Sequence, residues 1–152
     1  MTIKEFYTTY KAFALAIETE KKVPYLVTLA QAGLESAWGK HAPGHNFFGI
    51  KAGKSWKGRT QLLNTKEFVN GKMISVKAPF RAYDTIIDCF RDYADVLIRR
   101  FPKAFNYSSA IIFVNSLQTE HDYKYATDPD YVTKITKIIN TFLKLERQDK
   151  EF

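Results

Sequence analysis

Apolar side chains recur at intervals of three and four residues over five parts of the chain, which is the spacing of a buried helix face. The predicted helices end at charged runs or at helix breakers, such as the proline that follows the third one. Their approximate ranges are 1–21, 24–38, 84–100, 108–117 and 129–145. The pattern therefore predicts a mainly helical protein.

One stretch has the alternation of a strand pair instead. Residues 62–69 and 72–83 flank an Asn-Gly pair at 70–71, which is the strongest short signal for a tight hairpin turn. The two-residue turn pairs Glu67 with Ile74, so this carboxylate lies on the same face as apolar side chains. That face is expected to be buried or to face a cleft. A carboxylate there requires either an ion pair or a role in catalysis. With the helices, the hairpin predicts an α+β fold.

The second predicted helix carries a carboxylate at an unfavourable position. Glu35 lies in its last turn, where the helix dipole is negative, and its apolar neighbours are Leu34 and Trp38. Both effects raise the pKa of a carboxyl group, and a general acid must be protonated near neutral pH. An exposed surface glutamate is the alternative. Glu67, surrounded by lysines, should stay ionised, so the two carboxyl groups suggest an acid and a base.

The positive charge of the chain is concentrated in one segment. The net charge is +7, and residues 51–81 contain eight basic side chains and one acidic one. A localised basic field indicates a polyanionic partner such as nucleic acid, an anionic membrane surface or an anionic cell-wall polymer. A basic hairpin kept for solubility is the alternative. No recognised nucleic-acid-binding motif accompanies the charge, so nucleic acid is not the predicted partner.

Length and residue usage limit the remaining possibilities. The chain has the size of a single domain, 1–152, and its one cysteine, Cys89, lies on an apolar helix face, where a buried free thiol is expected. No apolar run reaches membrane-spanning length, so no membrane insertion is predicted. The first residues lack the pattern of a secretory signal, which leaves a removed signal or another export route. The charges of the third helix, Asp92 among them, predict a solvated face.

Metal binding is not predicted either. His41 and His45 lie four residues apart, but the Pro-Gly pair between them breaks a helix, and no cysteine or acidic cluster joins them. The sequence therefore predicts neither a metal site nor a cofactor.

Four motifs occur together in an order that resembles one enzyme family. They are ESAWG (35–39), NFFGIK (46–51), the TKEF and VNGK hairpin followed by FRAY (80–83), and YATDPDY (125–131). This set is similar to a glycoside hydrolase family 73 domain, a group of peptidoglycan N-acetylglucosaminidases. The resemblance covers about residues 22–145, with an added N-terminal helix over 1–21 and a tail over 146–152 that is expected to fray.

The resemblance implies a fold and a set of site residues. The fold would be a lysozyme-like, two-lobed domain in which the hairpin forms the smaller lobe. Glu35 matches the catalytic acid, Glu67 a second carboxylate that acts as base or activates water, and Tyr125 a tyrosine that assists catalysis or positions the substrate. The implied substrate-binding residues are Trp38, Asn46, Phe47, Phe48 and Tyr131.

The implied activity is that of an endo-β-N-acetylglucosaminidase, which cleaves the β-1,4 bond after N-acetylglucosamine in peptidoglycan strands. The protein would act as a monomer at the bacterial cell wall, in the periplasm or outside the cell, and its basic 51–81 segment would attract the carboxylates of the polymer. A lytic transglycosylase or muramidase that cuts the other glycosidic bond, and a catalytically silent wall-binding module, are the open alternatives.

Overall fold

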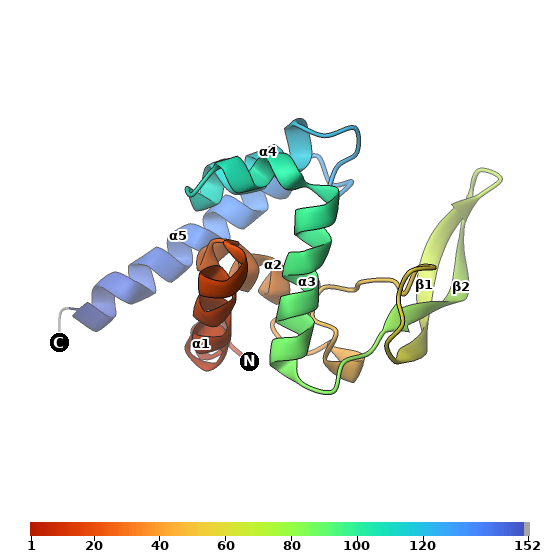
Figure 1. Ribbon diagram of the computed structural model, residues 1–152, viewed down its shortest axis with the longest axis horizontal. Helices are drawn as coiled ribbons and strands as arrows, with labels where there is room; N and C mark the ends of the chain where they lie inside the picture. The colour runs from red at the N-terminus through yellow and green to blue at the C-terminus, as the bar shows by residue number, and fades with distance from the viewer. Residues whose placement is uncertain (151–152) are drawn as a thin grey trace.

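The protein has a helical lobe and a smaller hairpin that projects from it (Figure 1). The computed structural model describes residues 1–150. The α+β class and the two-lobed arrangement agree with the prediction. The elements are α1 (Ile3–Lys21), α2 (Tyr25–Glu35), β1 (Thr60–Val69), β2 (Lys72–Arg81), α3 (Ile86–Arg100), α4 (Ala110–Thr119), α5 (Tyr131–Lys150) and two 3-10 turns, Pro43–His45 and Pro102–Asn106.

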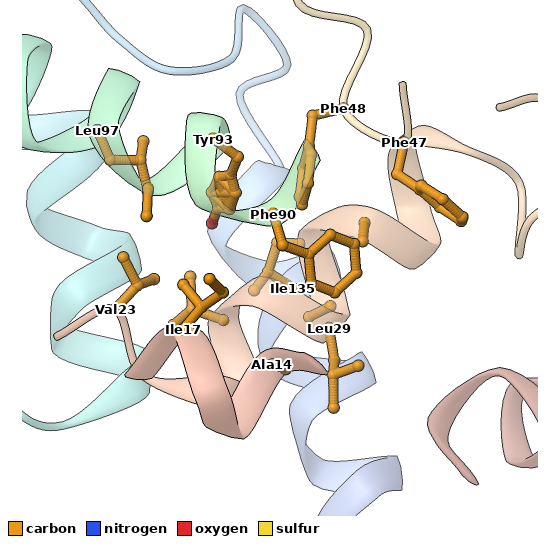
Figure 2. Packing of buried hydrophobic residues seen from close by; sticks show 14 of the residues in the cluster. Ala14, Ile17, Val23, Leu29, Phe47, Phe48, Phe90, Tyr93, Leu97 and Ile135 are labelled. Atoms are coloured by element: carbon orange, nitrogen blue, oxygen red, sulfur yellow. The ribbon is translucent and has the colours of Figure 1, made fainter. Parts of the chain in front are cut away.

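The core lies entirely in the helical lobe and is rich in aromatic rings. Phe90 of α3 is fully buried, and its ring centroid lies 5.9 Å from that of Phe47 and 5.6 Å from that of Phe48. Phe48 also packs on Tyr93, at 3.9 Å between ring centroids (Figure 2). The segment after α2 is therefore fixed to α3 by large apolar contacts, which are the main source of stability in such a core. Cys89 is buried beside these rings, as predicted.

Helix α2 is shorter than the predicted range of 24–38, because the chain turns back at its end. Ser36 donates a hydrogen bond from Oγ to the carbonyl of Ala32 (2.6 Å), and Trp38 adopts a positive φ of 59°. The Trp38 ring then folds over Gly33, where an added Cβ would lie 2.3 Å from it. Only glycine leaves room for this contact, and Glu35 becomes the last residue of the helix.

The hairpin has the predicted register, with Glu67 opposite Ile74. Its turn residues Asn70 and Gly71 have φ values of 51° and 79°, as a type I′ turn requires. From Thr60 to Pro79, however, no residue is buried, and burial begins only at Phe80. The predicted apolar face is therefore half-buried near its base and exposed toward the tip, because no helix packs against it.

Two terminal details differ from the sequence-based expectation. Helix α3 begins at Ile86 rather than at residue 84, and it is capped by Thr85, whose side chain accepts a hydrogen bond from the backbone N–H of Asp88. The tail was expected to fray from Glu146, but α5 continues to Lys150. Glu146 accepts hydrogen bonds from the hydroxyls of Tyr7 and Tyr25, which fix this end of α5 to α1 and α2. Residues 151–152 of the expected tail lie outside the described range.

Candidate active site

A cavity of about 960 Å³ opens beside the C-terminal end of α2. Its walls come from segments that are far apart in the sequence: the end of α2, the loop after the first 3-10 turn, the base of β2, the last turns of α3, and the loop that leads into α5 together with the first turn of that helix. The lining residues are Leu34, Glu35, Phe48, Gly49, Ile50, Lys51, Gly53, Ser55, Arg81, Val96, Arg99, Arg100, Phe101, Lys124, Tyr125, Ala126, Thr127, Asp128, Tyr131 and Lys134. A concave site of this size can hold sugar rings.

Glu35 lies on the wall of this pocket. Its side chain reaches solvent through the open mouth, yet the protein atoms around it desolvate the carboxyl group and raise its pKa, in the direction that the sequence predicted. Within residues 1–150, no group forms a hydrogen bond or an ion pair with the carboxyl group of Glu35. The ionised form thus lacks a compensating partner, in keeping with the upward shift of its pKa.

The floor beneath Glu35 is a buried polar chain. The hydroxyl of Tyr93 donates to the side-chain oxygen of Gln31, whose amide nitrogen donates to the hydroxyl of Tyr131 at 3.0 Å. The ring of Tyr125 lies 5.7 Å from that of Tyr131. Burial raises the pKa of Tyr125 and Tyr131, and the nearby charge of Glu35 raises both further, so both phenols stay protonated beside the carboxyl group. The structure thus gathers four of the predicted site residues: Glu35, Tyr125, Tyr131 and Phe48.

Three of the residues predicted to bind substrate do not line the pocket. Trp38 packs edge-on against Phe6, at 5.5 Å between ring centroids, and Phe47 is buried in the same core. The buried Asn46 donates from Nδ2 to the carbonyls of Ile50 (3.0 Å) and Arg81 (2.9 Å). These side chains support the pocket wall from behind, because each faces the core or the backbone of the loop.

Glu67 also lies outside the pocket lining, on the exposed part of β1. Its carboxylate is 3.6 Å from the ammonium group of Lys51, which does line the pocket, and 45% of its side chain is exposed. The predicted ion pair therefore exists, and the second carboxylate is connected to the pocket through it. The hairpin holds Glu67 at the edge of the site rather than on its wall.

The base of the hairpin is fixed by an ion pair that the sequence analysis missed. Arg81 donates from Nη1 to both carboxylate oxygens of Asp92 (3.1 and 2.9 Å), and the hydroxyl of Tyr83 donates to the same carboxylate (2.6 Å). Trp56 covers the guanidinium group at 4.7 Å. The prediction that the charges of α3 form a solvated face is wrong for Asp92, since the incoming strand covers it. Asp92 lies two positions after the inward-facing Phe90, and this spacing was too weak a signal to reveal the contact.

Three further basic side chains of the pocket were not singled out from the sequence. Arg99 and Arg100 come from the last turn of α3, and Lys124 comes from the loop before α5. The adjacent arginines before a proline were a visible signal, but nothing in the sequence placed them beside Glu35. Within residues 1–150, no group of three or more potential metal ligands occurs.

Comparison with known proteins identifies the family of the chain. The family described as Mannosyl-glycoprotein endo-beta-N-acetylglucosaminidase matches residues 11–144. The chain belongs to this glucosaminidase family. The match begins within α1, about ten residues before the range that the sequence motifs indicated.

Individual relatives of the glucosaminidase domain are bacterial. Peptidoglycan hydrolase FlgJ of Escherichia coli strain K12 is 35% identical over 143 residues, which cover 90% of this chain and 45% of that protein. Exo-glucosaminidase LytG of Bacillus subtilis is 35% identical over 129 residues, which cover 76% of this chain and 43% of that protein. This chain thus spans under half the length of these two relatives.

A solved structure confirms the fold of the glucosaminidase domain. The glycoside hydrolase domain of FlgJ from Salmonella typhimurium superposes with a TM-score of 0.82 at 31% identity, covering 99% of this chain and 94% of that one. In the described part of this chain, no helix is long and apolar enough to cross a membrane.

Proposed function

We propose that this glucosaminidase domain hydrolyses the glycan of bacterial peptidoglycan at the β-1,4 bond after N-acetylglucosamine. The observation that carries the proposal is the desolvated carboxyl group of Glu35 on the wall of the 960 Å³ pocket. The relatives named peptidoglycan hydrolase and exo-glucosaminidase support the choice of polymer and of bond. The site of action would be the bacterial cell wall, in the periplasm or outside the cell.

In this proposal Glu35 acts as the general acid. Glycosidic cleavage requires a proton for the leaving oxygen while positive charge develops on the sugar ring. A carboxyl group whose pKa is raised by its surroundings keeps more of its protonated form than an ordinary glutamate, and a bound sugar would displace water from the open mouth and desolvate it further. Tyr125, which lines the pocket and is only half-buried, offers aromatic surface to the sugar rings, whereas Phe48 and Tyr131 are almost fully buried and shape the wall.

Tyr125 and Glu67 have distinct proposed roles. The buried phenol of Tyr125, next to Glu35, would position the substrate rather than exchange protons, since its pKa is raised well above the ordinary value. Glu67 would activate water or stabilise the developing charge only after the hairpin closes over the glycan, because it lies outside the pocket lining. The wild-type rate therefore depends mainly on Glu35.

Analysis of the products by mass spectrometry tests the proposal on purified peptidoglycan, with wild type, Glu35→Gln and Glu67→Gln side by side. The expected products have N-acetylglucosamine at the reducing end, and early release of long fragments would indicate endo action. Muramic acid reducing ends would show a muramidase, and 1,6-anhydromuramic ends a lytic transglycosylase. Wall binding with no cleavage by wild type would show a silent binding module and overturn the proposal.

A further inference from the structure

The pocket carries more positive charge than its predicted chemistry uses. Six basic side chains line it, against two acidic ones, Glu35 and Asp128. Basic side chains thus outnumber acidic ones three to one on the pocket wall. The basic side chains are Lys51, Arg81, Arg99, Arg100, Lys124 and Lys134.

Three of these six cations are already paired. Lys51 lies 3.6 Å from Glu67, Arg81 2.9 Å from Asp92, and Lys134 2.5 Å from Asp128. The basic 51–81 segment that dominates the sequence thus supplies the pocket with two cations, Lys51 and Arg81, and both are paired by carboxylates of the protein itself.

The other three cations have no carboxylate within ion-pair distance among residues 1–150: Arg99, Arg100 and Lys124. The segments that carry them are joined, because the hydroxyl of Tyr123 donates to the carbonyl of Arg100 at 2.7 Å and so links the last turn of α3 to the loop that carries Lys124. The guanidinium group of Arg100 also stacks on the Tyr123 ring at 5.0 Å. The end of α3 and this loop therefore form a single cationic wall that is in place before any ligand binds.

Arg99 extends this wall beyond the main pocket. It also lines a second cavity of about 300 Å³, together with Ser55, Trp56, Arg81 and Asp92. A ligand group that branches away from a glycan beside Glu35 can reach this side. Arginine forks favour carboxylates, because the two N–H donors match the two carboxylate oxygens.

We propose that Arg99, Arg100 and Lys124 form a subsite for a carboxylate on the lactyl-peptide branch of the substrate glycan, and thereby select peptidoglycan over neutral polymers of amino sugars. This inference rests on the proposed function, because only a ligand bound beside Glu35 brings its branch to this wall. In peptidoglycan, the branch on each muramic acid carries the carboxylates. A polymer of N-acetylglucosamine alone has none.

The test compares a triple variant, Arg99→Gln/Arg100→Gln/Lys124→Gln, with a matched control, Lys4→Gln/Lys144→Gln/Arg147→Gln. The control removes the same charge from exposed positions that do not line the pocket. Initial rates of reducing-end release are measured on native peptidoglycan and on the same material after a carbodiimide and ammonia have converted its carboxylates to amides. Glycan stripped of its peptides by an amidase, which frees the lactyl carboxylate, is the third substrate.

The triple variant is expected to lose about 10- to 30-fold in kcat/KM on native peptidoglycan, mainly through KM, since each exposed ionic contact contributes about two- to threefold. On the amidated substrate it should match wild type within about twofold. A loss confined to native material identifies a carboxylate of the peptide as the anion, whereas a loss that also occurs on stripped glycan shows that the subsite accepts the lactyl carboxylate that the amidase has freed.

Equal losses on native and amidated substrates, or an equal loss in the control variant, would overturn the carboxylate subsite. Failure of the proposed function is distinguishable from this result, because wild type would then release no N-acetylglucosamine reducing ends from any of the three substrates, whatever the triple variant does.

Discussion

The helical lobe and the hairpin each carry one of the predicted catalytic carboxylates, and they hold it in opposite ways. Glu35 ends a helix whose residues from Val27 to Gly33 are all buried, and the protein around it raises its pKa. Glu67 lies on a strand without a buried residue, and its charge is balanced by an exposed lysine. Packing fixes the surroundings of the first carboxyl group but not of the second, so in the proposed mechanism the lobe would provide the acid and the hairpin the second carboxylate.

Removing each carboxylate in turn tests most directly whether Glu35 and Glu67 differ in this way. Glu35→Gln should lower kcat on peptidoglycan by about 10²- to 10⁴-fold, because the general acid is lost. Glu67→Gln should cost much less, about tenfold, since its carboxylate is mostly solvated in the open arrangement. Rates of reducing-end release measure both. A larger loss for Glu67→Gln would reverse the assignment of the principal residue.

The attachment of the hairpin to the lobe should depend on Asp92. Asp92→Ala leaves the nearly buried guanidinium group of Arg81 and the hydroxyl of Tyr83 without their acceptor, which should lower the free energy of unfolding by about 2–4 kcal/mol. Asp95→Ala on the same helix is the matched control, since its ion pair with Lys21 is at the surface and should contribute under about 1 kcal/mol. Urea unfolding measures both values, and equal losses would contradict a special role for the base of the hairpin.

The pH dependence of activity at alkaline pH should reflect the ionisation of Glu35 in the helical lobe and not that of Glu67 in the hairpin. Glu35 must be protonated to act, so kcat/KM should fall about tenfold per pH unit once the pH rises above its raised pKa. The pH at which the wild-type rate begins to fall should therefore be higher than the pKa of an ordinary glutamate. The same pH should be found for Glu67→Gln. Loss of the alkaline limb in that variant would assign it to the hairpin instead. Because the same carboxyl group resists ionisation, the folded state should lose stability as the pH rises through this range.

The smallest effect is expected at the tip of the hairpin. The Phe68 side chain is exposed, so Phe68→Ala should change the free energy of unfolding by less than about 0.5 kcal/mol. The same change at the buried Phe90 should cost about 3–5 kcal/mol. Thermal unfolding of the two variants provides the contrast. A large loss at Phe68 would mean that the hairpin packs against another surface in solution.

The sequence by itself predicted the elements and their chemistry wherever the controlling interactions are local. Hydrophobic spacing located the helices, and the Asn-Gly pair determined the hairpin register, because a two-residue turn leaves one way to pair the strands. The position of Glu35 at a helix end, with apolar neighbours in the chain, was sufficient to predict the direction of its pKa shift. The end of that helix was misplaced, since the turn depends on Trp38 packing over Gly33 and on Phe6 of another helix.

Only the tertiary structure decided which side chains share the pocket. Arg99, Arg100 and Lys124 join Glu35 from distant parts of the chain, while Trp38, Asn46 and Phe47, which are its neighbours in sequence, pack away from the pocket. The pairing of Arg81 with Asp92 is likewise invisible in a periodic pattern, because a helix face tells which residues avoid water but not which strand will cover them. Local patterns specify segments, whereas a site depends on contacts between segments, and those form only when the core packs.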